Sequence, residues 1–312
     1  MKKGKSTGRS GFIAITGRPN AGKSTFLNQV VGQKIAIVTP KAQTTRSRIV
    51  GIVTRPRSQM VFLDTPGIHT LGRTTALNRA MVATAFNSCH EVDLILYMID
   101  AVKGLDAEDQ NLLSQLPGCR DKPLLLLVNK IDRLAQADLL QRLSEIGEQI
   151  KQSSGWPAIA EVIPLSAMRG YNLPHLLDVL ERYLPKGPHY FPADQITDQP
   201  EHFLVAEIIR EKLFLLLQQE LPYSLAVQVE QFSEEPSGLL RIAALIVVAR
   251  PAHRPIVIGH RGQLLKKVGE QARLELEQLF ATRIHLQLWV KVDEGWSDNR
   301  QTLQELGYPM DP

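Results

Sequence analysis

Residues 11–184 alternate short apolar, β-branched runs with stretches whose apolar residues recur at helical spacing. We expect strands at residues 12–16, 48–54, 59–63, 93–99, 124–128 and 161–164. We expect helices at residues 23–31, 76–88, 108–116, 138–152 and 173–183. This order predicts an α/β domain whose mostly parallel sheet is covered by helices on both faces. Ligands of such sheets bind at the carboxyl ends of the strands, so we expect functional residues in the loops that follow them.

A second domain is expected after a linker. Residues 185–197 contain three prolines and one glycine and show no period, which is typical of a linker. Beyond it we expect a helix, two strands, a helix and a strand at about residues 199–219, 225–232, 239–249, 263–281 and 284–292. The sequence also allows a short helix before Gly259, but two prolines leave its first residue undefined. The expected parts are a basic tail (1–10), a first domain (11–184), the linker (185–197), a smaller α+β domain (198–295) and a C-terminal segment (296–312).

The composition is that of an ordinary globular protein. Hydrophobic residues make up 44% of the chain and charged residues 22%, which excludes a disordered or fibrous protein. The two cysteines, Cys89 and Cys119, are too few for a disulfide framework and favour a reducing compartment. The apolar runs fall short of the roughly 18 residues of a membrane span, and the basic residues 1–10 lead into no apolar signal sequence. We therefore expect a cytoplasmic protein.

The net charge of +4 is distributed unevenly. Residues 1–10 carry four basic residues and no acid, whereas residues 196–312 carry 12 basic and 16 acidic residues. Within that acidic half, residues 250–273 hold six basic residues against one acid. A local basic face on an acidic domain is typical of a footprint for phosphates, and a solvated helix face is the alternative.

Residues 17–24, GRPNAGKS, follow the first expected strand and open the first expected helix. Glycines let backbone N–H groups turn around phosphate oxygens, and the helix N-terminus adds partial positive charge. Lys23 is expected to pair with the β- and γ-phosphates, and Ser24 to ligate magnesium. The expected nucleotide-binding residues of this loop are Gly17, Arg18, Pro19, Asn20, Ala21, Gly22, Lys23, Ser24 and Thr25.

Three further motifs, DTPG, NKID and SAM, follow expected strands in a fixed order. Asp64 is expected to hold magnesium through water, and the Gly67 N–H to meet the γ-phosphate. The Asp132 carboxylate can accept both of the hydrogen bonds that guanine offers and adenine lacks, so we expect the site to reject ATP, which would leave this acceptor unpaired. The backbone of SAM, which begins at Ser166, is within reach of the guanine carbonyl. These motifs add Asp64, Thr65, Pro66, Gly67, Asn129, Lys130, Asp132, Ser166 and Ala167 to the expected nucleotide site.

The four motifs resemble those of translation-factor-type GTPases, and the linked second domain resembles that of the Era family, over roughly residues 11–308. QTTR at residues 43–46 matches the family's first switch. The resemblance implies that Thr45 closes onto magnesium when GTP is bound, joining Ser24 and Asp64. Thr44 is an alternative magnesium ligand. In a second alternative, both threonines lie in a mobile loop and their hydroxyls are hydrated.

Catalysis is implied by the same resemblance, with Lys23, Thr45, Gly67 and Asn20 as the expected catalytic residues. Ile68 occupies the position where Ras-like enzymes carry a water-orienting glutamine, which implies slow turnover or another way of positioning the water. An asparagine placed like Asn20 binds potassium in related GTPases, so potassium is a candidate cofactor. A turn-capping asparagine is the alternative.

The second domain carries VIGHRG at residues 257–262, with a G-x-x-G loop, and resembles a type II KH domain. In KH domains this loop lets a single-stranded nucleic acid backbone pass closely, and the domain offers no recognition helix for a DNA major groove. The expected RNA-binding residues are Gly259, His260, Arg261, Gly262, Lys266 and Lys267. An ordinary helix–helix turn is the alternative. Trp289 and Trp296 either stack on bases or pack in the interior.

The resemblance implies a specific partner, the 3′ end of 16S ribosomal RNA in the maturing small (30S) subunit. It also implies peripheral association with the inner membrane, for which the basic residues 2–9 are candidates. The eight histidines lack metal-ligand spacing, so we expect no structural metal besides nucleotide-bound magnesium. Two competing functions are a tRNA-modifying GTPase, disfavoured because no cysteine follows Cys119, and an RNA-binding scaffold with negligible turnover, which Ile68 keeps open.

Overall fold

The protein is described by a computed structural model, which covers residues 8–41, 44–67, 76–116, 121–218 and 221–306. The chain divides into two compact units. The first unit is formed by residues 1–36, 45–72 and 81–198, and the second by residues 37–44, 73–80 and 199–312. No helix in the described ranges combines the length and the apolar character that crossing a membrane requires.

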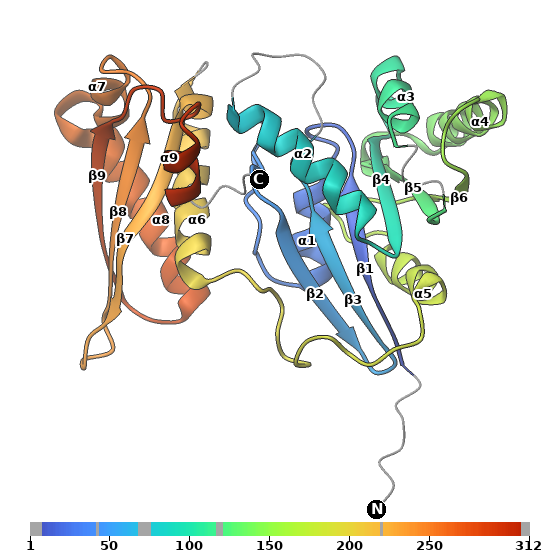
Figure 1. The fold of residues 1–312 in the computed structure, drawn as a ribbon, viewed down its shortest axis with the longest axis horizontal. Helices are drawn as coiled ribbons and strands as arrows, with labels where there is room; N and C mark the ends of the chain where they lie inside the picture. Colours follow the sequence, from blue (N-terminus) through green and yellow to red (C-terminus); the bar gives the residue numbers. More distant parts are fainter. Residues whose placement is uncertain (1–7, 42–43, 68–75, 117–120, 219–220, 307–312) are drawn as a thin grey trace, which may run out of the picture. The chain divides into compact units, whose positions relative to one another are not determined.

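The first unit is built on a six-stranded sheet with the order β2-β3-β1-β4-β5-β6 (Figure 1). Its strands are parallel except β2, which runs antiparallel to β3. The mostly parallel sheet is therefore confirmed. The strands are β1 (Arg9–Thr16), β2 (Ile49–Arg55), β3 (Ser58–Asp64), β4 (Leu94–Asp100), β5 (Leu124–Asn129) and β6 (Ile159–Pro164).

Helices connect most of these strands, while β2 and β3 are joined by a turn, and Figure 1 shows α1 behind the sheet and α2 in front of it. They are α1 (Lys23–Val31), α2 (Ala76–His90), α3 (Ala107–Ser114), α4 (Gln136–Gln152) and α5 (Leu173–Tyr183), with a 3₁₀ turn at Ile131–Arg133. The central strands β4 and β5 are continuous apolar runs because both of their faces are covered. The loops at residues 17–24, 64–67, 129–132 and 166–167 follow the carboxyl ends of β1, β3, β5 and β6, whereas Thr45 precedes β2.

The N-terminal boundary and the linker differ from the expectation. β1 begins at Arg9, which pairs with Ser58 of β3, so residues 9 and 10 belong to the sheet and not to a free tail. The Arg9 guanidinium also donates to the Leu184 carbonyl at 2.5 Å. Part of the linker lies along β2, because the Ile52 N–H donates to the Ile196 carbonyl at 2.8 Å. Covering this strand satisfies backbone groups that an edge strand would otherwise expose.

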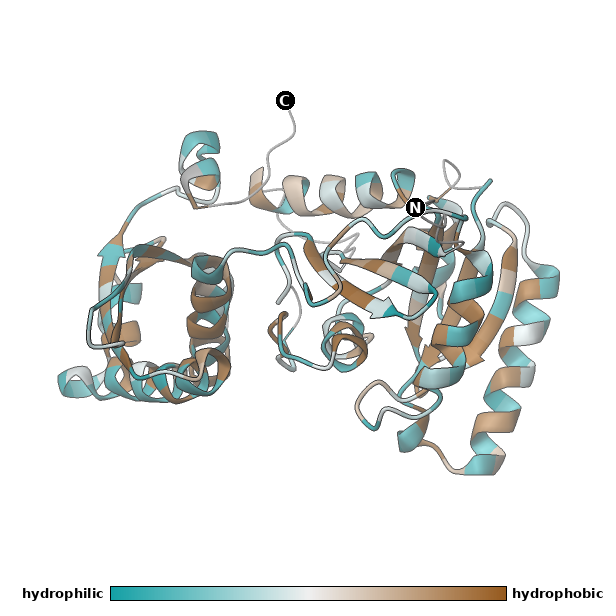
Figure 2. Cartoon of the chain, turned by 90° about the horizontal axis from the view of Figure 1, so that it is seen from below, coloured by the Kyte–Doolittle hydropathy of each residue, from teal (hydrophilic) through white to brown (hydrophobic). Residues whose placement is uncertain are grey.

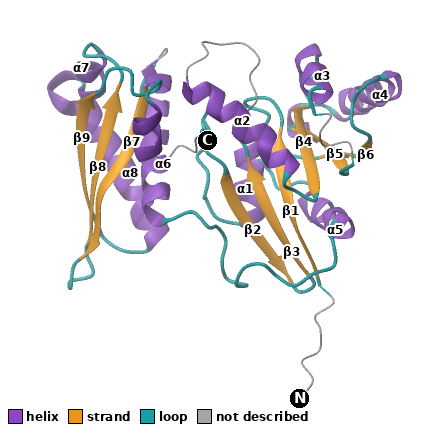
Figure 3. Ribbon diagram, in the orientation of Figure 1, coloured by secondary structure: helices purple, strands orange, loops and turns teal. Residues whose placement is uncertain are grey.

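The second unit contains a three-stranded sheet with the order β7-β8-β9 (Figure 3). β7 (Leu225–Glu234) is antiparallel to β8 (Leu240–Val248), which is parallel to β9 (Ile284–Val292). The helices are α6 (Glu201–Leu216), α7 (His253–Ile258), α8 (Gln263–Phe280) and α9 (Arg300–Glu305), with 3₁₀ turns at Leu221–Ser224 and His260–Gly262. The short helix before Gly259 therefore exists, as α7.

The two tryptophans of the second unit differ in burial. Hydrophobic residues gather where its helices and strands face one another (Figure 2), and alternate residues of β9 join this core. Trp296 is fully buried and its indole N–H donates to the Ser224 carbonyl at 3.3 Å. Trp289 lies at one of the alternating exposed positions of β9 and is 47% exposed. Interior packing is thus the role of Trp296 but not of Trp289.

Candidate nucleotide site and RNA-binding loop

The loop at residues 17–24 needs glycine for two reasons. Gly17 and Gly22 have φ values of 131° and 104°, in the region that favours glycine. A Cβ on Gly17 would lie 2.4 Å from the Met98 carbonyl oxygen, and one on Gly22 would lie 2.2 Å from Asn129 Nδ2. The loop therefore packs its backbone directly against the ends of β4 and β5. Asn20 adopts a left-handed conformation as well, with φ of 63°.

Lys23 begins α1 and is buried beneath this loop. Its ammonium donates to the carbonyl oxygens of Gly17 and Arg18, both at 2.9 Å. Burial lowers the pKa of Lys23 to about 8, while the charges of Asp64 and Asp109 act in the opposite direction. A cation held under a glycine-rich loop fits phosphate oxygens.

Three oxygen-bearing side chains meet beside Lys23. The Ser24 hydroxyl donates to Asp64 Oδ2 at 2.7 Å and shares a hydrogen bond of 2.9 Å with the Thr45 hydroxyl. Asp64 is fully buried, and its Oδ1 atom has no partner among the described residues. Burial raises the pKa of Asp64 to about 6, against the lowering effects of Lys23, Ser24 and Thr45. A buried carboxylate oxygen without a partner, beside two hydroxyls, fits the all-oxygen ligand set of magnesium.

The structure distinguishes the two threonines. Thr45 Oγ1 lies at the oxygen cluster, whereas the Thr44 hydroxyl donates to the Lys41 carbonyl at 2.8 Å and bonds the Thr39 hydroxyl at 2.7 Å. Gln43 of the same motif, as well as Ile68, lies outside the described residues.

The DTPG segment touches the glycine-rich loop. A Cβ on Gly67 would lie 2.9 Å from Pro19 atoms, so these two backbones approach closely. Thr65 turns away from this contact, and its hydroxyl donates to the Ile15 carbonyl of β1 at 2.9 Å. The structure thus brings residues 64–67 to the loop at residues 17–24, as their positions after neighbouring strands predict.

Asn129 links three of the predicted motifs. Its amide nitrogen donates to the Ala21 carbonyl at 2.8 Å, and its Oδ1 accepts a hydrogen bond from the Ala167 N–H at 2.9 Å. The Ser166 hydroxyl donates to Asp132 Oδ1 at 2.5 Å. NKID, SAM and the glycine-rich loop therefore form one connected site.

Lys130 adds a connection that includes a residue the motifs do not contain. Its ammonium donates to the Asn20 carbonyl at 2.6 Å and pairs with Asp100 Oδ2 at 2.7 Å. Asp100 ends β4 at the same sheet edge as the motifs. The place of Asp100 at the end of a strand is the sequence signal that could have identified it. A search for the motifs alone does not find it, because Asp100 belongs to none of them.

The G-x-x-G loop joins α7 to α8. Gly259, Arg261 and Gly262 have φ values of 72°, 49° and 78°. A Cβ on Gly259 would lie 2.6 Å from Leu264 Cβ, so only glycine fits there. The basic side chains predicted for this loop and the first turns of α8, His260, Arg261, Lys266 and Lys267, all reach the surface. They are accessible to a phosphate backbone.

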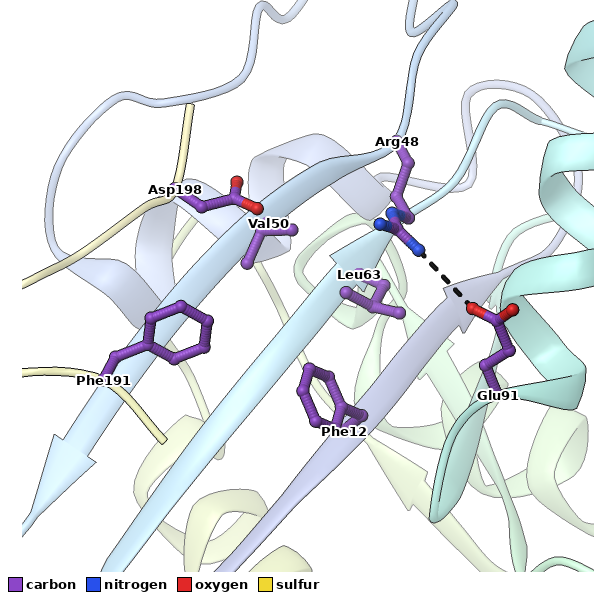
Figure 4. A pocket seen from close by; sticks show the side chains of 7 residues that line it. All are labelled: Phe12, Arg48, Val50, Leu63, Glu91, Phe191 and Asp198. Carbon is purple, nitrogen blue, oxygen red and sulfur yellow. Dashed lines mark ion pairs between the residues drawn. The ribbon is translucent and has the colours of Figure 1, made fainter. Parts of the chain in front are cut away.

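A separate pocket of about 230 Å³ lies against β1, β2 and β3 (Figure 4). An ion pair between Arg48 and Glu91, 3.8 Å long, stands at its rim, and Phe12 and Phe191 contribute aromatic walls. None of the expected nucleotide-binding residues lines this pocket.

Comparison with known proteins agrees with this geometry. A family model described as 50S ribosome-binding GTPase matches residues 12–130, and a KH domain model matches residues 220–297. GTPase Era of Geotalea daltonii is 46% identical over 299 residues, which are 96% of this chain and 97% of that protein. The chain belongs to the Era GTPase family. Era-family membership makes it a GTPase with a C-terminal KH domain, and so excludes a scaffold without turnover.

Two solved Era structures resemble the chain along its length. A single-residue variant of Aquifex aeolicus Era bound to GDP.AlF4⁻ has a TM-score of 0.90 and 38% identity, covering 96% of this chain and 99% of that one. Era in complex with MgGDPNP and nucleotides 1506–1542 of 16S ribosomal RNA has a TM-score of 0.90 and 39% identity, with the same coverage.

Proposed function

We propose that this Era-family GTPase is a nucleotide-controlled switch that binds 16S ribosomal RNA near its 3′ end and assists assembly and maturation of the small (30S) subunit. The RNA target is supported by the 39% identical Era that binds nucleotides 1506–1542, and by the exposed basic G-x-x-G loop. The switch is supported by an observation on this chain, the attachment of the segment before Thr45 to the second unit.

Residues 37–44 group with the second unit, whereas Thr45 groups with the first. Arg210 of α6 donates to the Thr44 carbonyl at 2.6 Å, and Glu211 accepts the Val38 N–H at 2.9 Å. The Lys41 ammonium donates to the Phe214 carbonyl near the C-terminus of α6 at 2.5 Å. A ligand that draws Thr45 toward magnesium therefore pulls on a segment held by the KH-containing unit.

The start of α2 shows the same attachment. Leu77 N–H donates to the Ser297 carbonyl at 3.1 Å, and Ala76 N–H donates to Asp298 Oδ1 at 3.0 Å. The described part of this segment, residues 76–80, groups with the second unit, as the segment before Thr45 does. From these attachments we infer that the two nucleotide states constrain the KH domain differently, which a switch requires.

The nucleotide roles follow from the connected site. We infer that the loop at residues 17–25, with the Lys23 ammonium, holds the phosphates of GTP or GDP. We infer that Ser24, Thr45 and Asp64 hold magnesium. Asn129, Lys130 and Asp132, with the backbone of Ser166 and Ala167, hold guanine. Magnesium supplies positive charge to the phosphates when it is bound.

Potassium is a further proposed cofactor, with Asn20 as its ligand. Asn20 stands at φ of 63°, so an alanine there would add backbone strain, and Asn20→Gly is the cleaner variant. We expect GTP turnover to be faster in potassium than in sodium for the wild type and equal in both salts for Asn20→Gly. Equal wild-type rates in the two salts would contradict the proposal.

The RNA proposal is tested by crosslinking and sequencing RNA bound to the protein loaded with a GTP analogue or with GDP. We expect reads concentrated at the 3′ end of small-subunit RNA, more of them with the GTP analogue, and their loss in Gly262→Asp. Gly238→Asp is a matched control, because both glycines have φ of 78° and open space around them. Reads on transfer RNA, or equal losses in both variants, would overturn the assignment.

A cytoplasmic location follows from the proposed ribosomal partner. Peripheral membrane association stays a prediction that rests on Lys2, Lys3 and Lys5, which lie outside the described residues. Arg9 no longer contributes, because it is part of β1. Cosedimentation with anionic vesicles, comparing the full chain with one lacking residues 1–7, tests this prediction.

A further inference from the structure

The Arg18 side chain leaves the nucleotide loop and turns toward the N-terminal turn of α3. Its guanidinium forms ion pairs with Asp106 and Glu108, and its Nη1 lies 3.9 Å from Asp109 Oδ2. These partners are 88 or more positions away in the sequence. The side chain is only 22% exposed, so solvent screens these ion pairs less than those of a free surface arginine.

The carboxylates that hold Arg18 are themselves fixed. Asp106 is the N-cap of α3, and its Oδ1 accepts hydrogen bonds from the N–H groups of Glu108 at 3.0 Å and Asp109 at 3.1 Å. Burial opposes ionisation, but these bonds and the Arg18 charge hold the pKa of Asp106 below its usual range. Asp109 is fixed in turn by the Tyr97 hydroxyl, which donates to its Oδ1 at 3.0 Å. Arg18 therefore binds a preorganised acidic site.

The Arg18 backbone belongs to the opposite side of this connection. Its carbonyl accepts a hydrogen bond from Lys23 Nζ at 2.9 Å, beside the equal bond to the Gly17 carbonyl. The next residue, Pro19, lies against Gly67. Fixing Arg18 thus fixes the peptide that positions the Lys23 ammonium and contacts the DTPG segment.

We propose that Arg18 is a positioning residue of the GTPase reaction, which anchors the phosphate-binding loop to the first turn of α3. The inference rests on the phosphate-binding role proposed above for residues 17–24. Preorganising a loop lowers the entropy lost when a ligand orders it, so the side-chain anchor strengthens nucleotide binding through the loop, while the guanidinium itself stays paired with α3. We expect the anchored loop to bind the nucleotide equally well in the ground state and in the transition state, so loss of the anchor changes KM and leaves kcat unchanged.

The test compares Arg18→Ala, Arg18→Lys and Asp106→Asn with the wild type in the full chain. Dissociation constants for GDP and a GTP analogue, KM, kcat and the urea midpoint are measured for each. Asp106→Asn removes the ion pair of Arg18 with Asp106, leaves the one with Glu108, and keeps an acceptor for the α3 cap. Arg55→Ala is the matched control, because Arg55 also pairs with two carboxylates, Asp178 and Glu181, and is not part of the nucleotide motifs.

Arg18→Ala is expected to raise KM and both dissociation constants about 10- to 100-fold, with kcat within about twofold of the wild type. Asp106→Asn is expected to act in the same direction. A double variant that combines Arg18→Ala with Asp106→Asn is expected to lose less binding free energy than the sum of the two single losses, because both substitutions remove the ion pair between these residues. Arg18→Lys is expected to restore part of the affinity, since an ammonium pairs with one carboxylate but lacks the guanidinium fork. Arg55→Ala is expected to leave KM unchanged.

The positioning role would be overturned if Arg18→Ala left KM unchanged or lowered kcat alone. It would also be overturned if Arg55→Ala raised KM as much as Arg18→Ala does. Additive losses in the double variant would do so as well. Lys23→Ala separates failure of this inference from failure of the proposed site. If Lys23→Ala binds GTP like the wild type, the phosphate-binding assignment itself is wrong.

Discussion

Arg210 Nη2 donates to the Thr44 carbonyl oxygen at 2.6 Å, and the next residue, Thr45, holds its hydroxyl 2.9 Å from Ser24 Oγ. Arg210 is 1% exposed and is also bound by the Glu207 carboxylate through two hydrogen bonds, of 2.5 and 2.7 Å. A buried, charge-neutralised arginine thus fixes a backbone position one residue away from the predicted magnesium ligand. Arg210 and Thr44 both belong to the second unit, and the chain continues from Thr44 directly into Thr45 of the first unit.

Arg210→Leu is expected to weaken the dependence of RNA binding on the nucleotide. Couplings between two sites are typically about 1 to 3 kcal/mol, or about 5- to 150-fold in affinity. We expect the ratio of RNA affinities with a GTP analogue and with GDP to fall toward one. Fluorescence anisotropy with a 3′-terminal 16S RNA fragment measures this ratio.

Lys41→Met gives an independent check, because it removes the donor to the Phe214 carbonyl without leaving a buried carboxylate unpaired. Arg241→Leu is the control. Arg241 of β8 also forms an ion pair, with Glu235, but none of its bonds among the described residues reaches the segment before Thr45. A ratio that stays at its wild-type value in both Arg210→Leu and Lys41→Met would refute the coupling.

Asp132→Asn is expected to weaken GTP binding by about 1.5 to 3 kcal/mol, because an amide lacks the charge and one acceptor that guanine uses. The Ser166 hydroxyl, which donates to Asp132, retains an acceptor in the variant. Binding of ATP is expected to remain undetectable. Isothermal titration with GTP and ATP measures both, with Asp138→Asn in the exposed first turn of α4 as control. Equal GTP affinity in Asp132→Asn and the wild type would rule out this carboxylate as the guanine contact.

Asp109→Asn is expected to change how stability depends on pH. Burial raises the pKa of Asp109 to about 7, against about 3.9 in an unfolded chain. Between these pH values the folded protein keeps a proton that the unfolded chain releases, so the free energy of unfolding falls as pH rises from about 4 to about 7.

The variant lacks this dependence, so its stability relative to the wild type is expected to increase by about 1 to 3 kcal/mol between pH 5 and pH 8. Urea unfolding of both proteins at pH 5, 6.5 and 8 measures the difference. A constant difference across the three pH values would show that Asp109 ionises normally in the folded protein.

Trp296→Ala is expected to destabilise the second unit by about 3 to 5 kcal/mol, because it removes a fully buried aromatic side chain and its hydrogen bond to Ser224. Trp289→Ala is the matched variant on the exposed face of β9, with an expected loss below about 1 kcal/mol. Calorimetry of the full chain compares the two variants with the wild type. Similar losses for both variants would contradict the burial that separates the two side chains.

The nucleotide motifs and several element boundaries could be predicted because their signals are local. α1, α5 and β9 have the predicted bounds residue for residue. Gly22 and Gly32 end α1 on both sides in the left-handed conformation, which favours glycine. The alternation of β9 is a period of two that a few neighbouring residues display.

The first residue of β1 could not be predicted from local signals. Arg9 and Ser10 are polar and follow a basic run, so they have the composition of a tail. They become strand residues because β3 and the segment after α5 supply hydrogen-bond partners, with Ser10 N–H bonded to the Pro185 carbonyl at 3.0 Å. Pairing energy supplied by distant segments overrides local propensity.

Residue types, periodicity and motif order by themselves determined a mostly parallel α/β domain with a glycine-rich loop after its first strand, followed by a smaller α+β domain. Tertiary structure alone decided which of Thr44 and Thr45 meets Ser24, which tryptophan is buried, and that Arg18 points to Asp106. The physical reason is the range of the interactions. Backbone geometry and amphipathic faces depend on neighbours within a few residues, whereas the contacts of Thr45 and Arg18 join residues 21 and 88 positions apart that only the folded chain brings together.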